Sequence, residues 1–251
     1  MHKLLLASCL VLLPLAAQAD SGPRTLSADI PAAGLDGVSL RIGVGEVHVT
    51  ASSDDKVHAH VTLRRKQREF MWFFHWMTEG SSSAIAAATL GQRTSGSQLT
   101  LALDVPHPSD QDDLDQDWDL QLPSRMKVDA DMKVGDLSIE GVAGGVAAKL
   151  DVGELTLDLP KGGIQAEVNV GEIRAKSGST GHGHIELSSS IGEANLIMEG
   201  TESGRRDHGG LGNQVILVGK GPDDMKLGIN IGEVTLRLDP REPGGHEGGG
   251  K

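Results

Sequence analysis

The stretch that decides the fold runs from Val146 to Glu172 and reads VAAKLDVGELTLDLPKGGIQAEVNVGE. It contains one short pattern twice, an aliphatic residue, a glycine and an acid, centred on Gly153 and Gly171. Apolar and polar residues alternate between the copies, as in Leu155-Thr156-Leu157-Asp158-Leu159, which is typical of a strand with one buried face. Gly-Glu turns and Pro160-Lys161-Gly162-Gly163 separate the strands, because glycine accepts the positive φ of tight turns. The stretch therefore predicts two strands and two turns in each period of 18 residues.

The same pattern occurs at six places in the chain. Its glycines are Gly45, Gly135, Gly153, Gly171, Gly192 and Gly232. The acids that follow them are Glu46, Asp136, Glu154, Glu172, Glu193 and Glu233. From Gly135 to Gly192 the glycines are 18, 18 and 21 residues apart. We interpret the 40-residue step to Gly232 as two rungs with one unmarked turn, and the 90-residue gap after Gly45 as a place where the period is lost.

A nearly constant period distinguishes between two all-β architectures. In a β-solenoid, or parallel β-helix-like fold, each period is one coil that must stack in register on the last, so its length is constrained. An antiparallel β meander has no such constraint. The sequence therefore favours a β-solenoid with rungs of about 18–21 residues and two strands per rung, and the meander stays open as the alternative.

Two stretches carry a family resemblance, Leu120 to Val128 and Val134 to Gly141. They resemble the putative-adhesin β-strand-repeat family of bacterial envelope proteins, a domain of unknown function. The resemblance covers Leu40 to Leu63 and Leu99 to Leu238. It implies a β-solenoid, a periplasmic or surface location, and no established catalytic residues.

The first 19 residues have the features of a cleavable export signal. A charged start, Met1-His2-Lys3, precedes an apolar run from Leu4 to Ala16, and Ala17-Gln18-Ala19 is a small-x-small cleavage site. The run is too short to span a bilayer. A rival lipobox-like reading at Leu6-Ala7-Ser8-Cys9 is weaker, because Cys9 follows little apolar sequence. We expect the mature chain to begin at Asp20.

Composition excludes several classes of protein. Acids outnumber bases by 35 to 23, a net charge of −12, which argues against nucleic-acid partners because phosphate binding needs clustered Lys and Arg. Cys9 is the single cysteine, so the expected mature chain has no disulfide or thiol nucleophile. With 34 glycines, three Trp, three Phe and no Tyr, the chain suits thin strands joined by tight turns.

One segment is both basic and aromatic in this acidic chain. The cations Arg64, Arg65 and Arg68 precede five of the six aromatic residues, which are Phe70, Trp72, Phe73, Phe74 and Trp76. Such a segment can cap the open end of a solenoid core, or it can contact a membrane surface or a partner protein. The following small-residue stretch, Ser81 to Gly91, is compatible with a short helix or a strand.

Acids and histidines raise the question of metal binding. The acid run from Asp110 to Asp119 fails the EF-hand pattern, because the positions for Gly and Glu hold Trp118 and Ser124, so we interpret it as a solvated loop. Three histidines would share the outer face of a hairpin-like pair of strands, and a further two form an i, i+2 pair; in order they are His48, His58, His60, His182 and His184. Zinc needs three or four converging ligands, so we predict surface histidines, no metal and no cofactor.

The sequence does not predict an enzyme. It has no Gly-x-Ser-x-Gly elbow, Walker loop, HExxH or strand-linked GxGxxG. Arg205-Arg206-Asp207-His208 is the one cluster worth testing for chemistry, and its glycine-rich surroundings indicate a flexible excursion between rungs.

The expected organisation has five parts: the signal peptide at 1–19, N-terminal strands at 20–63, an aromatic and small-residue insert at 64–97, the β-solenoid repeat domain at 98–240, and a disordered tail at 241–251. We expect a non-catalytic, exported, adhesin-like interaction or structural module of the bacterial envelope. Its partner would be an envelope protein, a glycan or a membrane surface. The alternatives are a membrane-associated accessory of envelope stress sensing and a polysaccharide-acting β-helix enzyme.

Overall fold

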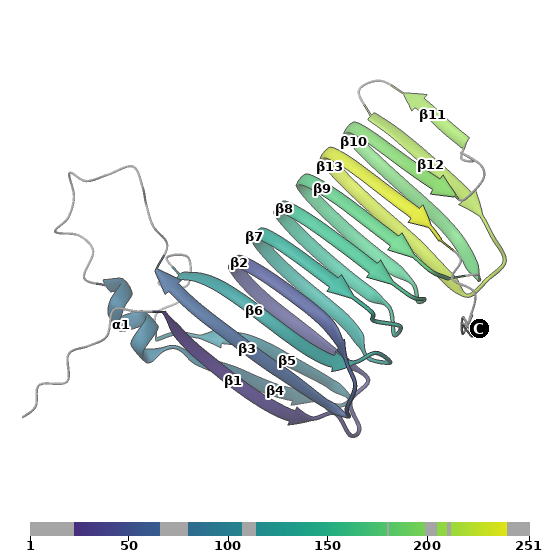
Figure 1. Cartoon of the computed structure of the whole chain (residues 1–251). Coiled ribbons are helices and arrows are strands. Elements are labelled where there is room, and N and C mark those ends of the chain that lie inside the picture. The colour runs from purple at the N-terminus through teal and green to yellow at the C-terminus, as the bar shows by residue number, and fades with distance from the viewer. Residues whose placement is uncertain are drawn as a thin grey trace, which may run out of the picture.

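Six long strands of 14 to 17 residues form the centre of the structure, a computed structural model (Figure 1). They are β2 (Gly37–Ser52), β7 (Lys127–Glu140), β8 (Val146–Leu159), β9 (Ile164–Ser177), β10 (His182–Met198) and β13 (Asp223–Leu238). They pair in parallel in the order β2-β7-β8-β9-β13-β10. The structure describes residues 23–65, 80–106, 114–179, 181–198, 205–209 and 212–239.

Shorter strands extend the sheet at both ends, by parallel pairing with β2 on one side and by antiparallel pairing with β10 on the other. Beside β2 lie β6 (Leu114–Pro123), β3 (Lys56–Arg65) and β1 (Arg24–Pro31), and the hairpin of β4 (Thr89–Ser95) and β5 (Gln98–Asp104) pairs with the first half of β2. Beside β10 lie β12 (Gly212–Val218) and β11 (Arg205–Gly209). The thirteen strands of the described residues form one mixed sheet, which confirms the predicted all-β class.

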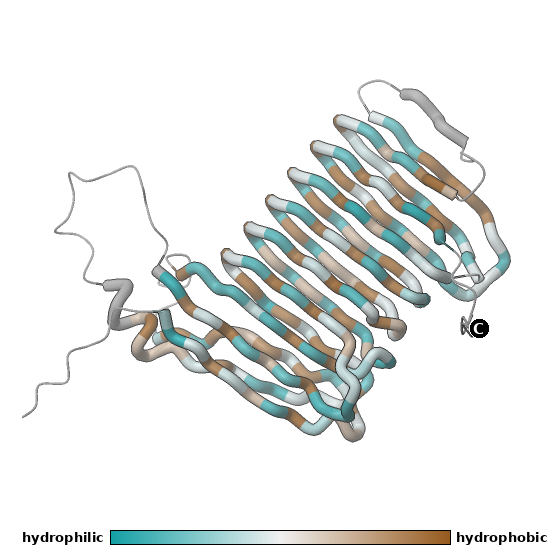
Figure 2. The backbone as a smooth tube through the Cα atoms, in the orientation of Figure 1, coloured by the Kyte–Doolittle hydropathy of each residue, from teal (hydrophilic) through white to brown (hydrophobic). Residues whose placement is uncertain are grey.

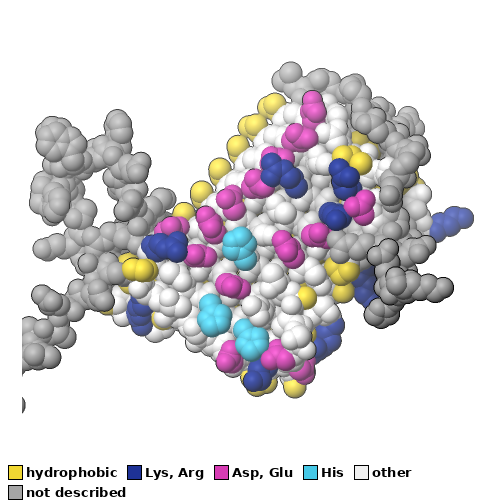
Figure 3. All heavy atoms as spheres, in the orientation of Figure 1, with side chains coloured by type: hydrophobic (Ala, Val, Ile, Leu, Met, Phe, Trp, Pro, Cys, Tyr) yellow, Lys and Arg dark blue, Asp and Glu magenta, His cyan; other side chains and the backbone are white. Residues whose placement is uncertain are grey.

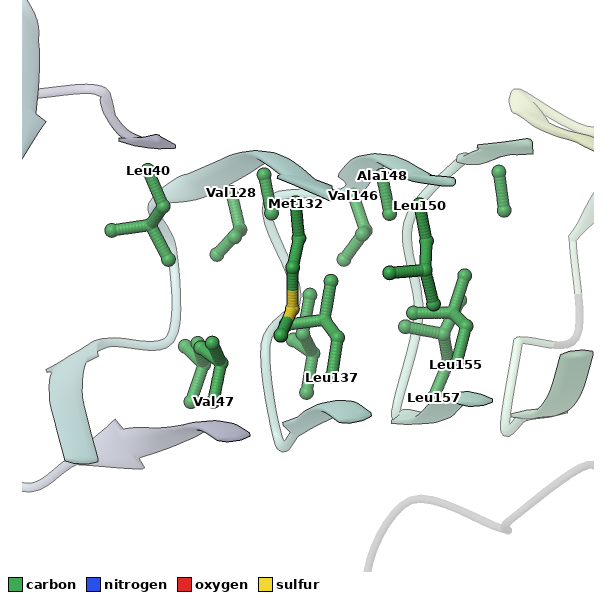
Figure 4. Packing of buried hydrophobic residues seen from close by; sticks show 14 of the residues in the cluster. Leu40, Val47, Val128, Met132, Leu137, Val146, Ala148, Leu150, Leu155 and Leu157 are labelled. Carbon is green, nitrogen blue, oxygen red and sulfur yellow. The ribbon is translucent and has the colours of Figure 1, made fainter. Parts of the chain in front are cut away.

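Each long strand folds over at its middle, so that its two halves face each other across the core (Figures 1 and 4). In β8, Val146, Ala148 and Leu150 point inward from the first half, and Leu155 and Leu157 from the second. Hydropathy alternates along the long strands (Figure 2), and the burial of their side chains alternates with it. A thin aliphatic core therefore runs through the whole stack, as the alternation in the sequence predicts.

A glycine occupies each fold-over point, and its neighbours leave no space for a side chain. Gly153 and Gly171 have φ of 143° and 145°, a region that L-residues rarely adopt. A Cβ on Gly153 would lie 1.8 Å from the carbonyl oxygen of Gly135, and one on Gly171 would lie 1.8 Å from that of Gly153. The backbones of successive strands thus approach one another at these bends, and glycine is required for that reason.

The order of the last coils corrects the sequence interpretation. Gly232 pairs with Gly171 on one side and with Gly192 on the other, so β13 lies between β9 and β10. The 21-residue step from Gly171 to Gly192 therefore does not join neighbouring coils, and reading it as one rung was wrong. β10 therefore does not pair with β9, although it follows β9 in the sequence, and β13 occupies the position between them.

The 90-residue gap is likewise not a break in the stack. Gly45 pairs directly with Gly135, and β2 and β7 are in register along most of their length. The intervening residues form β3 to β6 and the helix α1 (Gly80–Ala87), which build the N-terminal end of the sheet. Of the two structures left open for the small-residue stretch, a helix followed by the start of β4 is the one found.

Two segments expected to be irregular contain strands. Leu114, Gln116 and Trp118 are fully buried in β6, while Asp115, Asp117 and Asp119 alternate with them. The second half of the acid run is therefore a strand, and the solvated-loop interpretation was wrong there, because the alternation mattered more than the charge. The cluster from Arg205 to His208 lies in β11, paired with β12, and not in an irregular excursion.

The strand order can be checked by cross-linking. Thr235 is the direct partner of both Arg174 and Asn195. Cα atoms of direct partners lie within the span of a disulfide, and the expected mature chain has no cysteine of its own. We expect Arg174→Cys with Thr235→Cys, and Asn195→Cys with Thr235→Cys, to oxidise readily, which gel mobility without reductant would detect. Efficient oxidation of Arg174→Cys with Asn195→Cys would contradict this order.

Candidate functional site

The six repeated bends place two rows of side chains along one edge of the stack (Figure 3). The first row, the aliphatic ridge, consists of the residue before each bend glycine: Val44, Val134, Val152, Val170, Ile231 and Ile191. The second row, the acid row, consists of the residue after it: Glu46, Asp136, Glu154, Glu172, Glu233 and Glu193. Because the strands are in register, neighbours within a row are one strand spacing apart, about 4.8 Å.

The acid row carries more negative charge than its cations neutralise. Arg174 forms ion pairs with both Glu154 and Glu172, the latter at 2.6 Å. Among the described residues no ion pair is made by the other four members of the row. Asp117 on β6 is the direct partner of Glu46 and extends the row by one strand, where it pairs with Arg64 at 3.3 Å. Sequence reasoning missed Asp117, although the alternation in β6 could have placed it outward.

The second group of titratable side chains lies on β1 and β3 and in the turn between β2 and β3. His58 Nδ1 lies 2.7 Å from Asp29 Oδ1, and its Nε2 lies 3.1 Å from both carboxylate oxygens of Asp54. Hydrogen bonds to Asp29, and then to Asp54, raise the pKa of His58 above its ordinary value of about 6.5. The hydrogen bond to His58 in turn lowers the pKa of Asp54. Protonated His58 therefore joins β1, β3 and the turn before β3.

This contact predicts a pH-dependent contribution to stability. Because the pKa of His58 is raised by folding, its contribution is complete below its unfolded value of about 6.5 and is lost as the pH rises through the folded value. The stability contributed by Asp54 depends on pH in the opposite direction, because its pKa is lowered, and it is lost as the pH falls below about 4. We expect His58→Gln to lower the melting temperature more at pH 5.5 than at pH 8.5, as measured by thermal circular dichroism.

His48→Gln is the matched control. His48 is an exposed histidine of β2 whose side chain has no hydrogen bond or ion pair with another described residue. Its replacement should lower the melting temperature at pH 5.5 less than His58→Gln does. Equal effects of His58→Gln at pH 5.5 and 8.5 would contradict the assigned contact.

His48, His58 and His60 share an outer face of the sheet, as the sequence predicted, but β2 and β3 do not form a hairpin pair. β6 lies between β2 and β3, so Asp119 stands between His48 and His60 as the direct partner of each. Among the described residues no group of three His, Asp or Glu side chains converges as a metal site would require. His182 is half-buried, and this burial lowers its pKa, with Asp223 acting in the opposite direction.

Ser27, His60 and Asp119 lie on the neighbouring strands β1, β3 and β6, and these are the residue types of a nucleophilic triad. Ser27 Oγ lies 2.9 Å from His60 Nδ1. Across the described residues, no hydrogen bond joins His60 to Asp119, and Ser27 lies exposed on the outer face of β1. A working triad needs the base oriented by the acid and donors for the oxyanion. The arrangement is that of cross-strand neighbours on an open surface.

Two open hollows lie on the surface, and each holds charged groups. One, of about 440 Å³, is lined by Arg41, Asp104, Asp131 and Lys133 among others. The second, of about 430 Å³, contains Lys127, Asp224 and Lys226. Neither contains a histidine, serine or cysteine among its lining residues.

The predicted basic and aromatic segment falls mostly outside the described residues. Arg64 and Arg65 end β3, whereas Arg68 and the five aromatic residues from Phe70 to Trp76 lie outside, so their predicted role stays a prediction. The same holds for the signal peptide and for the tail at 241–251. The sixth aromatic residue, Trp118, is a core residue whose indole N–H donates to Gln116 Oε1 at 3.1 Å.

Within the described residues, no helix is long and apolar enough to cross a membrane.

The fold of this chain is similar to that of a solved structure, whereas its sequence matches no known family. The sequence matches no protein-family model and no curated protein. Among solved structures, a putative cell adhesion protein from Clostridium sporogenes is similar over 87% of this chain and 100% of its own, at 12% identity and a TM-score of 0.55. A putative adhesin from Bacteroides fragilis aligns over 86% of this chain and 97% of its own, at 12% identity but a TM-score of 0.30. The chain thus shares its fold with the clostridial protein.

Proposed function

We propose that this chain is a non-catalytic, exported interaction module of the bacterial envelope, and that its stacked coils form a β-solenoid. The observation that carries the proposal is the pair of rows along the bend edge, because six in-register strands repeat the same outward chemistry at a fixed spacing. Repeated rows on a rigid scaffold suit recognition of an extended partner, whereas catalysis needs different groups converging on one point.

The similarity to the clostridial cell adhesion protein supports the class of function. Fold alone does not fix a function, so the proposal depends on the surface as well as on the similarity. The predicted export signal at residues 1–19 supports a location outside the cytoplasm.

The experiment combines export and binding. The full chain should be recovered from a bacterial envelope fraction with an intact mass that begins at Asp20. The mature protein, immobilised, should then retain a component of outer-membrane, peptidoglycan or periplasmic extracts. An unrelated β protein of similar net charge serves as the control. Retention of the chain in the cytoplasm with residues 1–19 still attached, or no binding above the control, would contradict the proposal.

A second candidate, a membrane-associated accessory of envelope stress sensing, is favoured by the basic and aromatic composition of residues 64–77. Aromatic rings and cations are the side chains that favour the interface of an anionic membrane. Replacing Trp72, Phe73 and Trp76 with Ser should then release the protein from membranes without changing its melting temperature. Loss of the fold in this variant would instead support the capping interpretation.

A further inference from the structure

The aliphatic ridge holds most of the exposed large hydrophobic residues among those described. Its five members from β7 to β10 are between 40% and 48% exposed, and they are Val134, Val152, Val170, Ile231 and Ile191. They account for five of the seven exposed large hydrophobic residues among those described. Figure 3 shows them as an unbroken line.

Folding alone does not require aliphatic side chains at these positions. Stacking on the next coil covers about half of each side chain, and the rest faces solvent. Threonine has the same β-branched shape and would suit the strand and the exposure equally well. A continuous apolar line with a polar border is a general feature of interaction surfaces.

The acid row lies beside the ridge on every coil. The residue one position past the bend glycine is an acid in all six strands, and among the described residues only Glu154 and Glu172 share a cation, Arg174. The two rows together form a straight strip with an apolar half and an anionic half. From Val44 to Ile191 the strip spans five strand spacings, about 24 Å.

The charge of the strip selects its partner. Two copies joined ridge to ridge would bring two acid rows together, and like charges oppose such contact. An anionic membrane would be repelled for the same reason. A polypeptide whose apolar side chains alternate with Lys and Arg would bury the ridge and pair with the acids at once.

We propose that this docking strip, the aliphatic ridge with the acid row, binds a cationic, apolar polypeptide segment of a partner. The proposal depends on the proposed function, since it names the surface and the partner chemistry of the interaction module. Apolar burial supplies most of the affinity, and the acid row supplies the association rate and the selection against anionic partners.

The test uses designed peptides as probes. A helix-forming peptide of roughly 18 residues, made of Leu and Lys, is long enough to span the strip at 1.5 Å per residue. Two further peptides replace its Leu with Ser or its Lys with Glu. Of the three peptides, we expect the mature protein to bind only the Leu/Lys peptide. Its affinity should fall about tenfold or more between low and high salt, because screening weakens the ionic contacts. Fluorescence anisotropy measures the affinities.

Two triple variants locate the binding. The ridge variant carries Val152→Thr, Val170→Thr and Ile231→Thr, and the acid variant carries Asp136→Asn, Glu193→Gln and Glu233→Gln. Each should weaken binding about tenfold or more, with each replaced side chain contributing part of the loss. The charge-matched control replaces three exposed acids away from the bends, and consists of Asp36→Asn, Glu140→Gln and Glu167→Gln. It should bind as the parent does.

Several outcomes would overturn the strip. Unchanged binding by both triple variants would do so, and so would equal binding of the Ser-containing peptide. Binding of the parent to anionic vesicles that the ridge variant loses would assign the ridge to lipid. Melting temperatures establish that each variant is folded, and if the ridge variant is not, the acid variant decides. If envelope binding persists while the strip variants have no effect, the proposed function survives and this inference fails.

Discussion

Gly153→Ala should lower the free energy of unfolding by about 4 kcal/mol or more, one of the largest effects expected of any single substitution here. Two costs combine. Alanine would be strained at a φ of 143°, which costs about 1–3 kcal/mol. Its Cβ would also meet the Gly135 carbonyl oxygen at 1.8 Å, so the parallel pairing of β7 and β8 would have to open at the bend. Chemical denaturation of the mature protein measures the loss.

Gly34→Ala separates the two costs. Gly34 also has a positive φ, 79°, but a Cβ there would meet nothing within 4 Å. It should therefore cost only the backbone strain of about 1–2 kcal/mol. If Gly153→Ala were no more destabilising than Gly34→Ala, close approach of the backbones would not be what requires glycine at the bends.

The sequence predicts the bends because their cause is local. The glycine in each Val-Gly-acid or Ile-Gly-acid pattern is fixed by its own φ and, at every bend except Gly45, by the backbone of an identical glycine on the next strand. A regular repeat therefore predicts both the bend and its partner, and the 18-residue steps from Gly135 to Gly171 do join neighbouring coils.

Strand order could not be predicted in the same way. Any two copies of the pattern satisfy each other equally well at the backbone, so the pattern does not state which copies are adjacent. Gly45 and Gly135 are partners across 90 residues, and Gly232 lies between Gly171 and Gly192. Loops and excursions decide these pairings, and their sequences carry no comparable periodicity.

Charge misled the interpretation of β6, where alternation would have been the better guide. Five acids between Asp112 and Asp119 suggested a solvated loop, yet Leu114, Gln116 and Trp118 are buried at every second position. A strand with one solvated face can carry any number of acids on it. The acid row follows the same logic, since the repeat predicted its members but not its continuation at Asp117.

The candidate docking strip was partly foreseeable. The sequence identified the acids that follow the bend glycines as part of the repeat. The ridge was harder to recognise, because a valine or isoleucine in a strand pattern is ordinarily a core residue. The residues directly before the bend glycines are exposed because the strand folds over at the glycine, and this geometry is seen only in the three-dimensional structure.

Removing β13 should have the other largest effect. β13 pairs with β9 and β10 along nearly its whole length and contributes six buried aliphatic side chains, which are Met225, Leu227, Ile229, Val234, Leu236 and Leu238. Truncation after Gly219 should therefore cost at least about 5 kcal/mol, since each such side chain contributes roughly 1.5–3 kcal/mol. We expect β10 and β12 to become susceptible to protease while β2 to β9 persist, as mass spectrometry of the fragments would show.

Truncation after Asp239 is the control, because it keeps all of β13 and its Asp239 contact with Ser177. It should melt within a few degrees of the full chain. The 21-residue step from Gly171 to Gly192 offers the shorter chain one alternative pairing, the direct alignment of these two glycines. If the chain ending at Gly219 kept its stability and its Arg174→Cys, Asn195→Cys form oxidised readily, β9 and β10 would pair directly. β13 would then not be required to hold β9 and β10 in one sheet, contrary to the expected result.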